Sequence, residues 1–439
     1  MKFSEHIGKG IWAFASRTLQ PAYAISIIMV ARAISREEFG TLMVFQTLFS
    51  MLFTFSDAFA LQAIVKFGVE PLVKMEELVT VTTLLFISFL SVSLTVLLIF
   101  RTFVASLLDN SALADLLPWL AFFAILTIPR VVVVKILQTN FQMKKIFFVD
   151  FANFGIAGVL LAILLLNGHI HSALDVVHIT VFTGFLSSVV GTVLVRPYLK
   201  FRIRYSRAML ARISNFVRYQ VAMGVTTTAQ QNIDTLLVSG FTGATGAAIY
   251  GSAKMLFRAY DIVRETMVLF VFPAASKYYS RNDLSTLRTV LEKSVSFLYL
   301  ILIPGGIVLA FGAPFIFHLL YATKYDASIP IFRVLLLATL LFPIQMVFGV
   351  AMSGMGKIKE LFRMILLSFV VNVALATVLL ATVGIVGAAI AFVVASGVQA
   401  LLFLFYIRRE VGIRSSQLLT RGLFDSMRFL REHRNKLFS

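Results

Sequence analysis

The chain has 439 residues, of which 59% are hydrophobic and only 14% are charged. A water-soluble protein of this length carries a larger share of charged residues, so the composition indicates a membrane protein. The absence of cysteine excludes disulfides, thiolate metal sites and cysteine nucleophiles. The six histidines lack the HExxH spacing of a catalytic zinc site, and we expect neither a metal nor a cofactor.

Twelve segments are each long and apolar enough to cross a bilayer as a helix, which takes about 20 residues. Their apolar runs do not alternate as the strands of a β-barrel do, and a backbone within lipid has to satisfy its own hydrogen bonds. In chain order the predicted spans are 10–30, 41–65, 79–100, 113–137, 147–166, 176–195, 216–239, 247–272, 290–311, 329–352, 361–381 and 385–407. We therefore predict an all-α integral membrane protein of about twelve transmembrane helices.

Basic residues in the predicted loops indicate the orientation. Twelve spans place both termini on one side of the membrane, and that side holds nearly all lysines and arginines of the loops. The other side holds Arg32, Arg36, Arg101 and Lys324. Basic loops stay in the cytoplasm, so we predict a cytoplasmic (inner) membrane protein with both termini cytoplasmic. This bias accounts for the net charge of +18, and we expect no nucleic-acid partner.

The longest connection between spans divides the chain into two halves of six spans each. Halves with an even number of spans share one orientation, as parallel repeats do. Short turns at 35–40 and 243–248 follow the first span of each half. We predict an N-terminal six-helix bundle over 1–195, a basic cytoplasmic connector over 196–215, a C-terminal six-helix bundle over 216–407 and a tail over 408–439. Leucines at near-helical spacing among arginines predict that this tail is a basic amphipathic helix on the cytoplasmic leaflet, and a disordered basic tail is the alternative.

Five short sequences occur in an order and at spacings typical of one transporter family. They are Ala31-Arg32 with Phe39-Gly40, Asn232-Ile233-Asp234 with Tyr250 and Ala253, Phe272-Pro273-Ala274 with Ser276 and Arg281, Gly354-Met355-Gly356-Lys357 with Lys359, and Gly384-Ile385-Val386-Gly387-Ala388-Ala389. Over nearly its whole length the chain resembles the polysaccharide-transport branch of the multidrug/oligosaccharidyl-lipid/polysaccharide exporter superfamily, the Wzx-type oligosaccharide flippases. Ser35 and Ala248 stand where that family often has glycine, and Asp57-Ala58-Phe59 replaces its usual Asp-x-Gly.

The resemblance implies two six-helix bundles around a central cavity that opens alternately to each side of the membrane. It implies a polyprenyl-diphosphate-linked oligosaccharide as substrate, such as the repeat unit of O-antigen, capsule or exopolysaccharide. Lipopolysaccharide or another surface polysaccharide would be the product of the pathway. Membrane lipids, separate glycosyltransferases and a polysaccharide polymerase are the implied partners. The chain would then be a transporter and not an enzyme.

Charged residues inside the predicted spans are the candidate functional residues, because a charge deep in the bilayer costs about 2.5–3.5 kcal/mol and usually faces a cavity or a partner. In the eighth span, Lys254, Arg258, Asp261 and Glu265 follow one another at steps that place them on one stripe of a helix. The two cations suit the diphosphate of a lipid carrier. Alternatively, they form an internal ladder of ion pairs with the two acids.

Three further cations complete the predicted substrate-binding set. Arg17 lies in the middle of the first span near Pro21, and a proline there bends the helix as a gating element would require. The alternative is that backbone carbonyls freed by the proline hold Arg17. Arg130 and Arg333 lie in the fourth and tenth spans, and the alternative for both is that they reach out to the membrane surface.

Asp234 is the main candidate for coupling transport to a proton or sodium gradient. It lies in the middle of the seventh span, where a buried carboxylate can take up a cation. The alternative is an ion pair with Arg258 or Arg17. Glu265, Asp57 and Asp261 are further candidates for ion coupling.

Three other functions stay open. A multidrug antiporter of the same superfamily favours an acidic or aromatic cavity for organic cations, whereas cations outnumber deep acids in these spans. A membrane polysaccharide polymerase or ligase needs a sizeable external catalytic loop, and external loops such as 167–175 and 321–328 are short. In a non-transporting scaffold, all charges inside the spans would be structural. The sequence favours the flippase.

Overall fold

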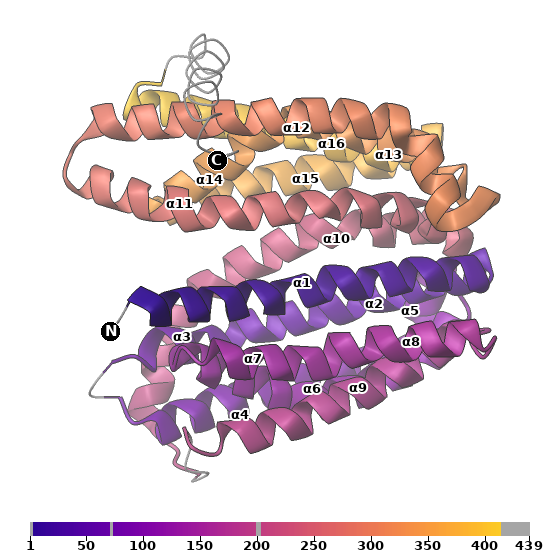
Figure 1. Ribbon diagram of the computed structural model, residues 1–439, viewed down its shortest axis with the longest axis horizontal. Coiled ribbons are helices and arrows are strands. Elements are labelled where there is room, and N and C mark those ends of the chain that lie inside the picture. The colour runs from indigo at the N-terminus through magenta and orange to yellow at the C-terminus, as the bar shows by residue number, and fades with distance from the viewer. Residues whose placement is uncertain (1–2, 71–72, 199–202, 414–439) are drawn as a thin grey trace. The chain divides into compact units, whose positions relative to one another are not determined.

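In the computed structural model the described residues are 3–70, 73–198 and 203–413, and the regular secondary structure within them is helical (Figure 1). The chain divides into two compact units. Unit 1 comprises Met1–Gly251 with Leu320–Lys324, and unit 2 comprises Ser252–Leu319 with Tyr325–Ser439. This division falls inside the eighth predicted span. The prediction of an all-α protein is confirmed.

Unit 1 is a helical bundle in which two spans contain a π-helical turn. Its elements are α1 (Phe3–Ala33), α2 (Arg36–Ser56), η1 (Asp57–Leu61), α3 (Gln62–Phe67), α4 (Met75–Ile99), α5 (Arg101–Leu107), α6 (Leu113–Thr139), α7 (Met143–Asp150), η2 (Phe151–Gly155), α8 (Ile156–Leu166), α9 (Ala173–Val195) and the part of α10 (Arg207–Phe257) that ends at Gly251. The π-helical turns η1 and η2 join α2 to α3 and α7 to α8, so each of these series forms one long span. In Figure 1, α9 runs along the edge of unit 1 opposite α1.

Unit 2 contains the rest of α10 and the helices that follow it. Its elements after α10 are η3 (Arg258–Tyr260), α11 (Asp261–Ser280), α12 (Leu284–Tyr321), η4 (Ala322–Tyr325), α13 (Ser328–Leu336), η5 (Leu337–Leu340), α14 (Phe342–Gly354), α15 (Ile358–Val383) and α16 (Ile385–Val411). The last residues of α12 and most of η4 belong to unit 1. The turn between α15 and α16 consists of Gly384 alone, whose φ of 77° is the left-handed conformation that favours glycine.

Short polar caps begin the helices of unit 1 where the sequence places turns. Ser35 accepts a hydrogen bond from the backbone N–H of Glu38 over 3.0 Å and so caps α2. Ser172 and Asp175 form a capping box at the start of α9. Glu38 also accepts a hydrogen bond from the backbone N–H of Ala173 over 2.6 Å, which ties the beginnings of α2 and α9 together.

The two similarly placed turns of the sequence lie against each other in unit 1. Helix α10 bends at Gly243, whose φ is 69°, and this bend ends the seventh predicted span. In α2, a Cβ atom on Gly40 would lie 1.7 Å from the carbonyl oxygen of Ala244. Only glycine permits this approach of two backbones.

The described helices include eight that are long and apolar enough to cross a membrane. The count is nine if Ser328–Leu340 and Phe342–Gly354, which meet at 51°, form one bent span. The predicted spans 10–30, 216–239 and 247–272 are helical in the structure but are not among these nine. A multi-pass membrane protein is therefore confirmed, while the total of twelve spans stays a prediction.

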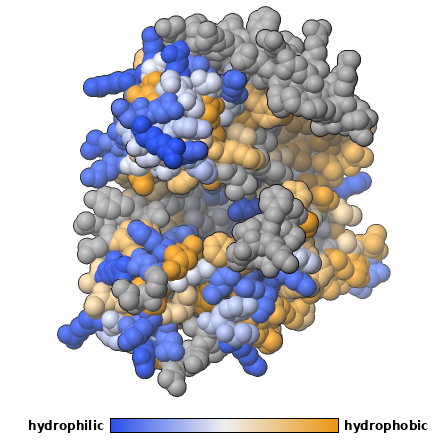
Figure 2. Space-filling view, turned by 60° about the vertical axis from the view of Figure 1, so that its left-hand side comes forward, coloured by the Kyte–Doolittle hydropathy of each residue, from blue (hydrophilic) through white to orange (hydrophobic). Residues whose placement is uncertain are grey.

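The outward faces of the helices are apolar, as contact with lipid requires. On α12, Val308, Phe311 and Phe315 are 69%, 82% and 71% exposed. Figure 2 brings the left-hand side of Figure 1 forward and shows hydrophilic residues at this end, with hydrophobic residues along the helix sides at the right. Helix ends are therefore polar and helix sides are apolar.

The predicted connector 196–215 is partly helical. Helix α10 begins at Arg207, and Met209 and Ile213 are buried against Phe67 and Leu78 in a cluster at the ends of α3 and α4. The first turns of α10 thus extend the seventh predicted span. The predicted tail 408–439 lies outside the described residues from 414 onward.

Candidate functional site

Arg130 of α6 is part of a polar cluster inside unit 1. Its Nη2 atom lies 2.7 Å from Oδ1 of Asp150, and the Ser16 hydroxyl donates a hydrogen bond to Oδ2 of the same carboxylate over 2.5 Å. The Arg130 and Asp150 side chains are 18% and 17% exposed. The guanidinium also lies 5.4 Å from the centre of the Phe154 ring. Three helical segments, α1, α6 and α7, therefore meet at one ion pair.

Lys135 forms a second ion pair from the same helix. Its Nζ atom lies 2.9 Å from Oδ1 of Asp57, and Gln62 donates a hydrogen bond to Oδ2 over 2.5 Å. These contacts join α6 to η1 and α3. The two in-span cations of α6 thus have acidic partners on other helical segments.

Both acidic partners lie at π-helical turns. Asp57 is the first residue of η1, and Asp150 directly precedes η2. A π-helical turn adds one residue to the helix and is frequent at functional sites. In η2, Asn153 is 8% exposed, and its Oδ1 atom has no hydrogen-bond partner among the described residues. The departure Asp57-Ala58-Phe59 from the family pattern therefore lies in η1.

Asp234 has a tyrosine as a partner. The carboxylate is 1% exposed, and the Tyr250 hydroxyl donates a hydrogen bond to its Oδ2 over 2.6 Å. The backbone N–H of Thr235 donates to Oδ1 over 2.8 Å. Asp234 and Tyr250 lie on either side of Gly243, so this hydrogen bond holds the bend of α10. Asp234, the candidate for ion coupling, is thus hydrogen-bonded across the bend of α10.

The charged stripe of the eighth span is not on one continuous α-helix. Helix α10 ends at Phe257, the 3₁₀ turn η3 follows, and α11 begins at Asp261. A 3₁₀ turn has three residues per turn instead of 3.6, so it rotates everything that follows it. Lys254 is 9% exposed, whereas Arg258 is exposed. The side chains of Asp261 and Glu265 lie outside the described part of the structure.

Arg17 lies on an exposed face of α1, four residues before Pro21. The proline cannot donate to the carbonyl of residue 17, which weakens the helix at this point. Across the described residues, no three His, Asp or Glu side chains gather as the ligands of a metal ion would.

Arg333 contacts a neighbouring helix of unit 2. Its Nε atom donates a hydrogen bond to the carbonyl oxygen of Ala310 in α12 over 3.0 Å. Pro314 lies one turn further along α12 and has no N–H for that carbonyl. Arg333 thereby satisfies a backbone oxygen that its own helix leaves without a donor.

We expect Arg333→Met to lower the melting temperature of the solubilised protein by about 2–4 °C, because a carbonyl loses its charged donor. Pro314→Ala restores an N–H to the helix, so Arg333→Met should lower the melting temperature less in the Pro314→Ala variant than in the parent protein. Thermal unfolding of the two single variants and the double variant measures this coupling. Equal losses with and without the proline would contradict this role.

Sequence reasoning did not identify the partners of the α6 cations. The sequence does not mark Asp150 or Ser16 as candidate site residues, whereas Tyr250, the partner of Asp234, belongs to one of the five short sequences that carry the resemblance. The spacing of Arg130 and Lys135 on one helix, with single acids in two other spans of the same half, was the available indication.

Comparisons with known proteins agree with this architecture. Residues 28–330 match the family described as "Polysaccharide biosynthesis protein". The chain is 20% identical over 200 residues to a "Probable low-salt glycan biosynthesis flippase" of Haloferax volcanii, a match that covers 46% of this chain and 42% of that protein.

Two solved structures show the fold. An inward-facing multidrug resistance transporter of the MATE family, in the MOP superfamily, aligns with a TM-score of 0.78 at 16% identity, over 91% of this chain and 98% of that one. The lipid II flippase MurJ in an inward closed conformation aligns with a TM-score of 0.72 at 15% identity, over 98% and 93% of the two chains. Because the family model matches more than half of its length, the chain belongs to the polysaccharide biosynthesis protein family, and it shares its fold with these two transporters.

Proposed function

We propose that the protein is a flippase that moves a polyprenyl-diphosphate-linked oligosaccharide across the cytoplasmic membrane by alternating access. The observation that carries this proposal is the match to the polysaccharide biosynthesis family in a chain with the fold of a transporter. The fold alone does not separate a flippase from a multidrug antiporter, because both share it. Family membership favours a glycan substrate, and the glycan biosynthesis flippase of Haloferax volcanii supports the same choice.

The proposed topology has twelve spans with both termini in the cytoplasm. Three of the twelve proposed spans are not among the nine strongly apolar ones. The first is α1, which carries Arg17, and the second is the part of α10 before Gly243, which carries Asp234. The third runs from the end of α10 through α11 and contains Arg258. Spans that line a water-filled cavity can carry charged side chains, whereas spans that face only lipid exclude them. Their lower hydropathy therefore fits the proposed transport path.

Within unit 2 we assign diphosphate binding to Arg258, and within unit 1 to Arg17, whereas Lys254 is 9% exposed and we assign it no contact with the substrate. Arg17 and Arg258 are exposed, as a substrate contact requires. A guanidinium donates two parallel hydrogen bonds to one phosphate, which suits it to hold the carrier's anionic group. Arg130 and Arg333 have the contacts described above, and we propose that they position helices around the path. Asp234, held at the bend of α10, is the proposed ion-coupling carboxylate.

Replacing Arg258 with alanine should abolish most export while leaving the protein in the membrane. We expect the lipid-linked precursor to accumulate and surface polysaccharide to fall by about tenfold or more, because one strong phosphate contact contributes more than 1.4 kcal/mol. The measurement is the amount of precursor and surface polysaccharide in cells with equal membrane levels of the protein.

Arg281→Ala is the matched control, because Arg281 is an exposed arginine at the end of α11, beyond the predicted span. We expect it to export normally. Normal export by a well-expressed Arg258→Ala variant would show that Arg258 does not hold the diphosphate. Loss of organic-cation extrusion with intact polysaccharide export would instead identify a multidrug antiporter.

A further inference from the structure

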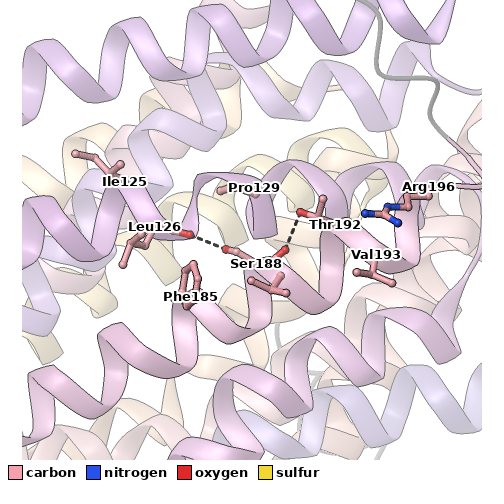
Figure 3. Close-up of a pocket in the computed structure, with 9 residues that line it drawn as sticks. Ile125, Leu126, Pro129, Phe185, Ser188, Thr192, Val193 and Arg196 are labelled. Carbon is pink, nitrogen blue, oxygen red and sulfur yellow. Dashed lines mark hydrogen bonds between the residues drawn. The ribbon is translucent and has the colours of Figure 1, made fainter.

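A groove of about 320 Å³ runs between α6 and α9 on unit 1. Figure 3 shows Ile125, Leu126 and Pro129 of α6 along one side, and Phe185, Ser188, Thr192 and Val193 of α9 along the other. Helix α9 forms the edge of unit 1 opposite α1, and α1 packs against α7 and α8 (Figure 1). The groove therefore opens on the outer, lipid-facing side of the unit.

Pro129 explains why a groove forms here. A proline inside a helix removes one backbone hydrogen bond and pushes the preceding turn aside. The Ser188 hydroxyl of α9 enters the gap, where it accepts from the backbone N–H of Arg130 over 3.3 Å and donates to the carbonyl of Leu126 over 2.7 Å. The hydroxyl thus bridges the turn that Pro129 disturbs, which fixes the separation of the two helices.

The walls of the groove are mostly hydrocarbon. Ile125, Phe185, Val189 and Val193 are 58%, 48%, 44% and 52% exposed. The Thr192 hydroxyl is used within its own helix, where it donates to the carbonyl of Ser188 over 2.8 Å. A sugar would lose its hydrogen bonds to water here without replacement, so the walls exclude it. An alkyl chain fits this chemistry.

One end of the groove is cationic. Arg196 follows α9 directly, is exposed, and turns its guanidinium back toward Thr192 and Val193 (Figure 3). Among the described side chains, no carboxylate lies within ion-pair distance of Arg196. Lys145 is at the same end of α9, where it donates to the carbonyl of Leu194 over 3.3 Å and lies 4.5 Å from the Tyr198 ring centre. The end of the groove is therefore suited to an anionic phosphate.

We propose that this groove is a binding site for an anionic phospholipid of the membrane, with one acyl chain between α6 and α9 and the phosphate on Arg196. Basic pockets between spans at the cytoplasmic surface recognise anionic head groups in this way. The phosphate of a membrane phospholipid stays at the level of the head groups, which is where the end of a span places Arg196. This site does not depend on which substrate the protein transports.

The test uses the purified full-length protein in detergent with dioleoyl-phosphatidylglycerol or dioleoyl-phosphatidylcholine. Native mass spectrometry counts retained lipid, and thermal unfolding measures stabilisation by each lipid. We expect phosphatidylglycerol to bind at least tenfold more tightly than phosphatidylcholine. Arg196→Gln should remove this difference, and Arg196→Lys should keep part of it, because an ammonium retains the charge and loses the two-pronged hydrogen bonds.

Groove-filling variants test the position of the acyl chain. Val189→Trp should lower phosphatidylglycerol binding about tenfold, and Val193→Phe, a smaller change, covers the case in which Val189→Trp does not fold. Val159→Trp on α8 is the matched control, because Val159 is 55% exposed and lies outside the groove. Equal binding of both lipids, or unchanged binding by Arg196→Gln, would overturn the site. Retention of undecaprenyl phosphate with no phosphatidylglycerol would also overturn it and would mark a contact for the carrier lipid. No transport assay enters this test, so its failure is separate from failure of the proposed flippase function.

Discussion

Arg130→Ala should destabilise the protein more than any other substitution of an in-span cation described above. The change leaves Asp150 as an uncompensated carboxylate that is 17% exposed inside a bundle in lipid. Breaking a buried ion pair from one side costs on the order of 3 kcal/mol, since the remaining charge keeps its desolvation penalty. We expect the melting temperature of the solubilised protein to fall by roughly 3–5 °C, measured by thermal unfolding.

The double variant Arg130→Ala with Asp150→Asn should recover part of this loss, because no charge then remains without a partner. Arg101→Ala on α5, where the side chain is exposed, should leave the melting temperature within about 1 °C of the parent. If Arg130→Ala and Arg101→Ala unfold at the same temperature, the ion pair with Asp150 does not stabilise unit 1.

Gly40→Ala should be strongly destabilising although it adds a single methyl group. The new Cβ would lie 1.7 Å from the carbonyl oxygen of Ala244, so α2 and the bend of α10 would have to separate. Overpacking of this kind costs about 1–3 kcal/mol, and here the obstacle is a backbone atom that no rotamer change can move. We expect lower membrane levels and a melting temperature reduced by about 1–3 °C.

The control is the same substitution at Gly305 of α12, where an added Cβ would meet no atom within 4 Å. Alanine favours a helix over glycine by about 0.5–1 kcal/mol, so Gly305→Ala should raise the melting temperature slightly. A harmless Gly40→Ala variant would mean that the two backbones are not in contact.

Ion pairs also hold helix ends in unit 2. Lys357 lies 2.7 Å from Oε1 of Glu410, and the Tyr279 hydroxyl donates to the same oxygen over 2.5 Å. The hydrogen bonds to Glu410 and Tyr279 raise the pKa of Lys357 above its ordinary value. Lys357 therefore stays charged throughout the physiological range, and this contact links the ends of α11 and α16 to the turn before α15. Its residues include part of the sequence Gly354-Met355-Gly356-Lys357 that carries the resemblance.

The sequence by itself determined the class of the protein. Runs of about 20 apolar residues have one stable form in lipid, so helices, and most of their bounds, follow from composition. The sequence also placed the short turns at 35–40 and 243–248 and the glycine at 384, because a left-handed backbone depends on the local residue type. The sequence also indicated the family, because five short sequences occur in its order and at its spacings. Residues 28–330 match the family of polysaccharide biosynthesis proteins.

Only the tertiary structure decided what the in-span charges contact. Asp57 and Asp150 lie in sequence far from Lys135 and Arg130, and π-helical turns at both acids change the direction of side chains without a clear sequence signal. The 3₁₀ turn η3 likewise breaks the stripe that a regular helix would have formed from Lys254 onward. Pairing across helices depends on packing in three dimensions, whereas a periodic pattern describes one helix at a time. For that reason the sequence indicated which residues carry charge inside the membrane, and the fold determined their partners.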